Sequence, residues 1–304
     1  MAIIDVVMLL GVAALWGASF LFMRQAVPVL GPIPMIEARV LVAGLGLLLV
    51  AVLMRRVPDL RRDVRGFLAL GALMAAVPFT LIAAAEMKIT ASLAAVLNAT
   101  TPLFALLVSS IRQGTRPSRM QLAGVALGVA GVTVLVGLGP LRLDGMLVLA
   151  VLASLLASLF YALGGVYAKV RFRDTHPVVT ATGQQLGAAA CLLLPTLALP
   201  PRHAVTGGIV VAVLVLALAC TALGFVVFFQ LVKRVGPAGA LTVTFLVPLF
   251  GLLWGTVFLG EPLSWSMPPG LLLVLGAVFL VTERRTGTSP RARPALRARS
   301  SRAN

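Results

Sequence analysis

The side chains that could do chemistry in this sequence are polar and aromatic groups scattered through long apolar segments. Such groups are costly in lipid unless they face a cavity or a partner, which makes them default candidates for a solute site. Hydroxyl, amide and aromatic groups of this kind suit the wall of a cavity. The candidate cavity residues are Trp16, Thr80, Asn98, Thr101, Tyr161, Gln230, Thr242 and Thr244.

Each candidate also has a purely structural alternative. Asn98 and Gln230 could form interhelical hydrogen bonds, which are worth only ~0.6 kcal/mol each on average. A threonine hydroxyl can bond to the backbone of its own helix. The rings of Trp16 and Tyr161 could serve packing instead of lining a cavity, and the sequence leaves these alternatives open.

Three prolines fall inside the apolar segments, namely Pro78, Pro102 and Pro248. A proline inside a helix removes one backbone hydrogen bond and kinks the helix. We predict hinges at these positions, and a static kink that serves packing is the alternative.

Ionisable groups in or beside the apolar segments are few. Glu86, near the outer end of the third segment, is the candidate for proton coupling, and a solvated carboxylate at the edge of a loop is the alternative. Glu37 and Arg39 lie two residues apart in the second segment, so they do not share a helix face. No role is assigned to either residue.

Residues for covalent or metal chemistry do not cluster in the sequence. His176 and His203 fall in loops, whereas Cys191 and Cys220 lie inside apolar runs, as small buried hydrophobic residues do. A phosphate-binding loop of glycines followed by Lys and Ser or Thr is missing from the sequence. We therefore predict no catalytic residue, no metal site and no cofactor, and an ATP-driven pump is disfavoured.

The composition indicates an integral membrane protein. The 304 residues are 60% hydrophobic and 11% charged, whereas a soluble domain carries about 25% charged residues. The apolar runs are continuous and close to the length of about 20 residues that a transmembrane helix needs. The net charge of +16 resides between these runs and in the C-terminal tail, so we predict no nucleic-acid partner.

We predict an all-α protein with ten transmembrane helices. The predicted segments cover residues 4–23, 34–54, 66–85, 91–111, 120–138, 145–168, 178–199, 208–231, 238–259 and 267–282. The connections are short, so sequential helices should pack as antiparallel neighbours. Residues 284–304 are rich in Arg, Pro and Ser, and we predict a disordered basic tail there.

The distribution of basic residues predicts the orientation. With the N-terminus placed in the cytoplasm, the inside loops carry 13 Lys and Arg residues and the outside loops carry four, before the tail is counted. Basic residues in short loops favour the cytoplasmic side. We therefore predict a multi-pass protein of the inner (plasma) membrane with both termini in the cytoplasm.

The chain contains an internal repeat. The run Pro102-Leu103-Phe104 recurs 146 positions later as Pro248-Leu249-Phe250, and Gly114 matches Gly260 at the same offset. Five helices is an odd number, so the second copy must be inverted in the membrane, and the basic loops alternate accordingly. Inverted repeats are typical of secondary transporters, with the substrate site near mid-membrane between the copies.

The repeated motifs resemble a known family. Residues 16–20 (WGASF), 37–39 (EAR) and 97–104 (LNATTPLF) look like one EamA repeat, and residues 247–250 (VPLF) with 259–263 (LGEPL) look like the second. The resemblance implies the drug/metabolite transporter superfamily, with two inverted five-helix halves around a central cavity. It also implies that the fifth and tenth helices brace the others, with a homodimer contact there as one option.

The sequence therefore predicts a carrier with a first repeat over residues 1–138 and a second over residues 145–283. It would move an amino acid, another metabolite or a drug-like solute through the lipid bilayer by alternating access, with export as the favoured direction. A membrane-embedded lipid-modifying enzyme would instead need a paired acid and base or a metal cluster. A non-transporting membrane scaffold is the remaining alternative, but it does not explain the inversion.

Overall fold

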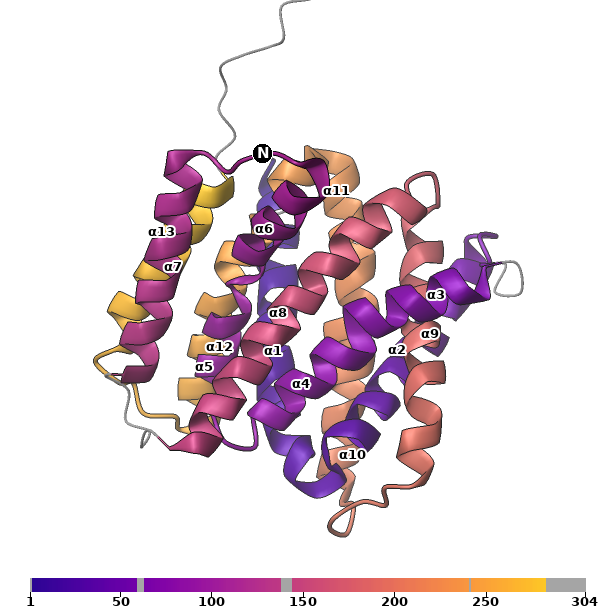
Figure 1. Cartoon of the computed structure of the whole chain (residues 1–304). Coiled ribbons are helices and arrows are strands. Elements are labelled where there is room, and N and C mark those ends of the chain that lie inside the picture. The colour runs from indigo at the N-terminus through magenta and orange to yellow at the C-terminus, as the bar shows by residue number, and fades with distance from the viewer. Residues whose placement is uncertain (1, 59–62, 138–143, 241, 283–304) are drawn as a thin grey trace, which may run out of the picture.

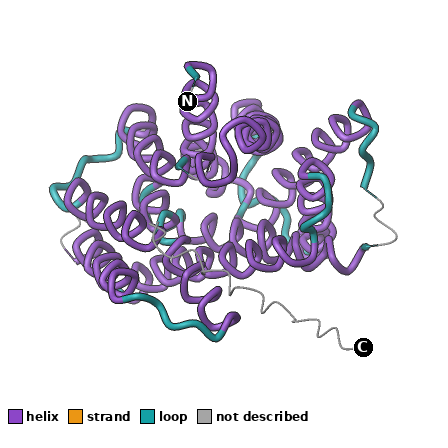
Figure 2. The backbone as a smooth tube through the Cα atoms, turned by 90° about the horizontal axis from the view of Figure 1, so that it is seen from above, coloured by secondary structure: helices purple, strands orange, loops and turns teal. Residues whose placement is uncertain are grey.

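The computed structural model describes residues 2–58, 63–137, 144–240 and 242–282. Every regular element within these ranges is helical, and Figure 2 shows helices joined by loops. The first half contains α1 (Ile3–Leu30), α2 (Pro32–Leu53), α3 (Val64–Gly71), η1 (Ala72–Ala76), α4 (Val77–Ala85), α5 (Ala91–Asn98), α6 (Thr101–Gln113) and α7 (Arg119–Gly137). The second half contains α8 (Gly145–Arg171), α9 (Pro177–Leu197), α10 (Gly207–Leu214), η2 (Val215–Leu223), α11 (Gly224–Ala240), α12 (Val243–Leu259) and α13 (Met267–Thr282).

Eight of the helical segments are long and apolar enough to cross a membrane, and α12 and α13 are shorter apolar helices. Together they correspond to the ten predicted segments. The first helix is longer than predicted, because it continues past Arg24 to Leu30 and ends only at Gly31, where φ is 82°. The predicted tail, residues 284–304, lies outside the described residues.

The two halves end their matched helices in the same way. Gly114 closes α6 and Gly260 closes α12, and both adopt the left-handed conformation, with φ of 62° and 63°. Residues with a side chain rarely adopt this conformation, whereas glycine does so without a steric penalty. The sequence offset of 146 positions therefore corresponds to one repeated backbone feature.

The packing of the helices is symmetric between the halves. The first span of each half packs against the fourth span of the other: α1 contacts α12, and α8 contacts α5 and α6. The first span of each half also packs against the third span of the other: α8 contacts α4, and α1 contacts η2 and α11. The pairs α2–α9 and α7–α13 each join equivalent helices. Figure 1 shows α1 starting at the end of the molecule where α8 finishes, so the second half is inverted relative to the first.

The third span of each half contains a π-helical segment, η1 in the first half and η2 in the second. Such segments are uncommon and occur often at functional sites. In the first half, η1 ends at Ala76, two residues before Pro78, which lies at the start of α4. Because proline has no backbone N–H to donate, the widened turn is a suitable place for it.

Small residues allow the fifth and tenth spans to approach closely. A side chain added at Gly124 or Gly131 of α7 would collide with α13, and one added at Gly270 of α13 would collide with Leu135 of α7. Glycine at such positions is a common basis for close packing between membrane helices. The α7–α13 pair thus forms a tightly packed unit at one side of the bundle (Figure 1).

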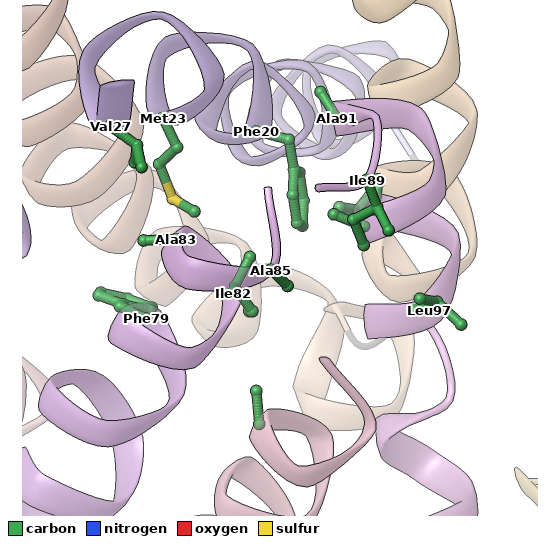
Figure 3. Close-up of a cluster of buried hydrophobic side chains, with 14 of the residues drawn as sticks. Phe20, Met23, Val27, Phe79, Ile82, Ala83, Ala85, Ile89, Ala91 and Leu97 are labelled. Atoms are coloured by element: carbon green, nitrogen blue, oxygen red, sulfur yellow. The ribbon is translucent and has the colours of Figure 1, made fainter. Parts of the chain in front are cut away.

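The main hydrophobic core contains side chains from both halves of the chain. Figure 3 shows part of it, where Phe20 and Met23 of α1 lie against Phe79 and Ile82 of α4. The Met23 side chain extends from α1 toward α4 in this view. The polar cluster described next borders this part of the core.

Candidate functional site

A buried arginine on α2 is the centre of a polar cluster. Arg39 is 5% exposed, and its Nε donates a hydrogen bond to the Thr221 hydroxyl of η2 at 3.1 Å. Its Nη1 lies 3.1 Å from the Met23 sulfur of α1, and its guanidinium carbon lies 3.9 Å from the centroid of the Phe79 ring on α4. Four helical segments, contributed by both halves, therefore meet at one cation.

The depth of Arg39 makes it a functional candidate. It lies seven residues after Pro32, the first residue of α2, which places it about 10 Å along the helix at 1.5 Å per residue. A cation inside an apolar span is costly and is by default a candidate for function. Sequence reasoning missed Arg39, although its place within a predicted segment was the signal that could have found it.

The π-helical segment η2 sets the direction of the Thr221 hydroxyl. This hydroxyl donates to the Leu216 carbonyl at 2.8 Å, across the five-residue separation of a π-turn. Since its single hydrogen is used there, its lone pairs can accept the hydrogen of Arg39 Nε. The local backbone of the second half thus orients an acceptor toward the cation of the first half.

Trp16 and Tyr161 occupy equivalent positions, because the first helices of the two copies correspond at an offset of 145, one less than the offset of 146 between the Pro102 and Pro248 runs. Trp16 of α1 contacts Phe228 of α11, with ring centroids 5.1 Å apart, and Tyr161 of α8 contacts Phe79 of α4 at 6.1 Å. Each ring therefore reaches from the first span of one half to the third span of the other. Both side chains are half-buried, so they combine packing with partial exposure.

Two of the predicted cavity residues carry buried polar atoms without a hydrogen-bond partner among the described residues. These atoms are Thr80 Oγ1 and Asn98 Oδ1. On α9, the side-chain nitrogens of Gln184 and Gln185 are also buried without a hydrogen-bond partner among the described residues. A buried polar group normally has a partner, so each such atom calls for a water molecule or a ligand as its explanation. Gln184 is also the position that matches Arg39 in the second half.

Two further predicted residues, Thr101 and Thr242, make the local hydrogen bonds of the structural alternative. The Thr101 hydroxyl donates to the Asn98 carbonyl at 2.8 Å, and the Thr242 hydroxyl donates to the Gly239 carbonyl at 2.7 Å. Gln230 is exposed on α11, and Thr244 is half-buried on α12. The structure therefore brings Arg39 together with residues that were not predicted as cavity residues, while the Thr101 and Thr242 hydroxyls bond to nearby backbone carbonyls.

The three predicted hinge prolines occupy different local structures. Pro78 follows η1, Pro102 is at the start of α6 after a break in the fourth span, and Pro248 lies inside the continuous helix α12. The matched prolines at 102 and 248 therefore occupy different positions in their helices. The break in the fourth span comes instead where α5 ends at Asn98.

Glu86 is buried, so the alternative of a solvated carboxylate is wrong. It directly follows the third apolar segment and is 1% exposed. Neither carboxylate oxygen has a hydrogen-bond partner among the described residues, while Arg24 Nη1 donates to its backbone carbonyl. Burial raises the pKa of Glu86 well above its ordinary value of 4.5, Arg24 and Arg39 oppose this rise, and Glu261 adds to it.

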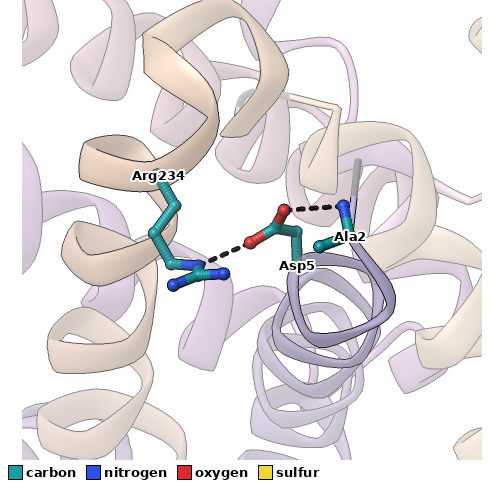
Figure 4. A network of polar contacts seen from close by, with 3 residues as sticks. All are labelled: Ala2, Asp5 and Arg234. Carbon is teal, nitrogen blue, oxygen red and sulfur yellow. Dashed lines mark hydrogen bonds and ion pairs between the residues drawn. The ribbon is translucent and has the colours of Figure 1, made fainter.

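Polar contacts join the halves at both ends of the bundle. At the N-terminal end of α1, Arg234 Nε donates to Asp5 Oδ1 at 2.5 Å (Figure 4). At the opposite end, Glu261 accepts from the Ala91 and Ser92 backbone N–H groups at 2.7 and 3.0 Å, and so caps α5. Within the described ranges, groups of three or more His, Cys, Asp or Glu side chains that could hold a metal ion are not found.

Two inverted five-span halves that meet at a buried polar cluster define a membrane-transport class of protein. The chain belongs to the EamA-like transporter family, whose model matches residues 3–137 and again residues 148–283. The protein is accordingly a multi-pass membrane transporter.

Relatives and a solved structure agree with this assignment. The chain is 31% identical over 275 residues to the inner membrane transporter YedA of Escherichia coli strain K12, covering 88% of this chain and 87% of that protein. It is 27% identical to protein PecM of Dickeya dadantii, covering 88% of this chain and 89% of that protein. A crystal structure with 20% identity, which covers 93% of this chain and 97% of that one, has a TM-score of 0.63 and shares the fold.

Proposed function

We propose that this transporter is a secondary carrier that moves a small metabolite across the inner membrane by alternating access, with export as its direction. The observation that carries the proposal is the polar cluster around Arg39, where α1, α2, α4 and η2 of the two halves meet. A substrate site at the repeat interface is typical of carriers built from inverted repeats. Trp16, Thr80, Asn98 and Tyr161 would contribute aromatic and polar groups to the same site.

Polar contacts at both ends support the alternating step. The Asp5–Arg234 pair joins α1 to α11, and the Glu261 cap joins the segment before α13 to α5. Both are small sets of contacts that a rocking motion can break one at a time. The proposed cycle opens one end while the other stays joined.

Glu86 is the proposed coupling residue. The charged groups around it are Arg24 on α1, Arg39 on α2 and Glu261 before α13. A buried carboxyl with a raised pKa can hold a proton at a pH where an exposed carboxyl has lost it, and can release the proton when water reaches it. Glu86→Gln should make flux independent of an imposed pH gradient, whereas flux that still responds to the gradient would remove Glu86 from this role.

The distribution of basic loops supports a cytoplasmic location for both termini, with the first repeat over residues 1–138 and the second over residues 145–283. The α7–α13 unit lies at one side of the bundle. A homodimer formed through it stays a prediction.

The direct test is a flux screen across a metabolite panel, read by mass spectrometry in cells that do or do not express the protein. Trp16→Ala and Asn98→Ala should reduce flux at normal expression. Thr133→Val is the matched control, since the Thr133 hydroxyl bonds only to the Val129 carbonyl of its own helix at 2.9 Å. A wild-type protein that inserts but moves no solute in the panel would favour the scaffold alternative.

A further inference from the structure

The guanidinium of Arg39 forms no ion pair with any of the described residues. The ion pairs among the described residues are Asp5–Arg234 and Asp63–Arg171, and neither involves Arg39. Glu86 is near enough to interact with Arg39 through its charge, but it makes no ion pair with it. A buried charge without a partner is strongly unfavourable, so an arginine at this depth calls for an anion from outside the chain.

We propose that Arg39 binds the carboxylate of an organic anion, and that this monoanion is the substrate class of the transporter. The inference rests on the proposed transport function and names its chemical specificity. The proposal follows from the position of the unpaired Arg39 cation beside the Phe79 ring and the Met23 side chain. Both side chains offer apolar surface to the body of a solute whose carboxylate binds Arg39.

The contacts of Arg39 leave an edge of the guanidinium for a ligand. Arginine has five N–H donors in a planar fork. In the described part of the chain, Nε–H bonds to Thr221 and one Nη1–H faces the Met23 sulfur. Three donors therefore remain. A thioether is a weak acceptor, which a carboxylate oxygen can replace, and the Nη1–Nη2 edge fits a bidentate carboxylate.

The surroundings favour a monoanion over a phosphate. Among the described residues, the contacts of Arg39 are with Thr221, Met23 and Phe79 and include no second cation, and Arg24 donates instead to the Glu86 backbone carbonyl at the end of the third span. A dianion bound to one guanidinium would leave one negative charge unpaired in an apolar span. A single carboxylate carries one negative charge, which the guanidinium neutralises. The aromatic groups Phe79 and Tyr161, with ring centroids 6.1 Å apart, suit an apolar or aromatic ligand body.

The rival interpretation is that Arg39 is a structural bridge that fastens α1, α2 and η2 together. The two interpretations differ in the empty protein. A bridge stabilises the fold, so its removal should lower the melting temperature. An uncompensated binding cation opposes folding, so its replacement by an apolar side chain of similar length should leave the empty protein equally stable or more stable.

The experiment compares wild-type protein with Arg39→Met and Arg39→Lys, purified as full chains in nanodiscs. The probes are hexanoate, benzoate, phenylacetate and N-acetylphenylalanine, each paired with its neutral primary amide. At least one carboxylate should raise the melting temperature of wild-type protein, and its amide should not. Arg39→Met should weaken that binding roughly 10- to 100-fold, and Arg39→Lys should keep part of it. Arg119→Gln, which removes an exposed arginine at the start of α7, is the control.

The outcomes separate the inference from the function on which it rests. Four results would each overturn the inference. Two concern the wild-type protein: none of the carboxylates stabilises it, or the amides stabilise it equally. Two concern Arg39→Met: it retains carboxylate binding, or without ligand it melts clearly below wild-type protein. Flux of neutral or cationic solutes at an undiminished rate through Arg39→Met liposomes would overturn it too, while the transport function would stand. Carboxylate binding without any flux through wild-type liposomes would leave the site in place and contradict the transport function.

Discussion

The two halves of the molecule share a frame but differ in the chemistry that they place at its centre. The left-handed glycines at 114 and 260, the π-helical segments and the Trp16–Tyr161 pair recur in equivalent places. At position 39 the first half carries an arginine, whereas at the matched position 184 the second half carries a glutamine. In the proposed mechanism, the symmetric packing would give two equivalent ways to open the bundle, and the unequal side chains would give it a selective site.

The fourth and ninth spans are interrupted at different places. The fourth span breaks between Asn98 and Thr101, where Asn98 Oδ1 is buried without a partner in the described part of the chain. The matched stretch around Pro248 remains one helix, α12. A broken helix exposes backbone polar groups that an intact helix satisfies internally. The second half is interrupted too, since α11 ends at Ala240 and α12 begins at Val243, so the halves differ in where the interruption falls and in the cation that the first half supplies.

The largest expected effect comes from making the two halves alike. Arg39→Gln copies the residue of the second half and removes the buried charge. Flux of a carboxylate solute in liposomes should fall roughly 10- to 100-fold, as expected for the loss of charge-assisted hydrogen bonds. Gln184→Leu, the matched change in the other half, should have a smaller effect on flux. Equal losses in the two variants would contradict the asymmetry.

A second prediction concerns the shared frame. A side chain at Gly71 of α3 would collide with the backbone of Gly187 and Ala188 on α9, which has little freedom to move. Gly71→Ala should therefore destabilise the protein by about 1–3 kcal/mol through overpacking. Gly165→Ala, on the exposed side of α8 with open space around it, should leave the melting temperature unchanged or slightly raised. Thermal unfolding in detergent measures both.

A third prediction concerns the pH dependence of stability. Because burial raises the pKa of Glu86 in the folded protein, the folded state holds its proton to higher pH than the unfolded state. Stability should therefore fall as pH rises above the ordinary carboxyl pKa of 4.5 toward the raised value. Melting temperatures of wild-type protein and Glu86→Gln across this range should show a flatter profile in the variant. Parallel profiles would mean that another group dominates.

The smallest effect is expected at the polar contact near the N-terminus. Asp5 pairs with Arg234, whose side chain is 46% exposed. Ion pairs near solvent contribute little to stability, so Asp5→Asn should lower the melting temperature by no more than a few degrees. Asp5→Asn should reduce flux more clearly than it reduces stability, since the lost contact joins α1 to α11. A large loss of stability would mean that the contact is structural.

Much of the fold could be predicted from the sequence, because lipid imposes a simple rule on helix length and polarity. The positions of the ten apolar segments, the inversion and the family followed from apolar runs, basic loops and the repeat around Pro102 and Pro248. The extension of α1 past Arg24 was missed because a basic residue resembles the end of a span. The π-helical segments carried no recognisable pattern of their own.

The site was harder to predict, because it depends on which side chains meet across helices. Local hydrogen bonds, such as that of Thr101 to Asn98, were foreseen as alternatives. The meeting of Arg39 with Met23 and Thr221 joins residues 16 and 182 positions apart, and no local pattern indicates it. Glu86 was named as the coupling candidate with a solvated carboxylate as the alternative, and its burial could not be predicted from its neighbours in the sequence.

The central claim is that the inverted halves open the two ends of the bundle in alternation. Its most direct test is a pair of reversible cross-links in a background without the native Cys191 and Cys220. One joins Asp5→Cys to Arg234→Cys, and the other joins Ser92→Cys to Glu261→Cys at the opposite end, where their side chains are 2.5 Å apart in the native protein. Either cross-link alone should stop net flux in liposomes, and reduction should restore it. Continued flux with one end fully cross-linked would contradict alternating access.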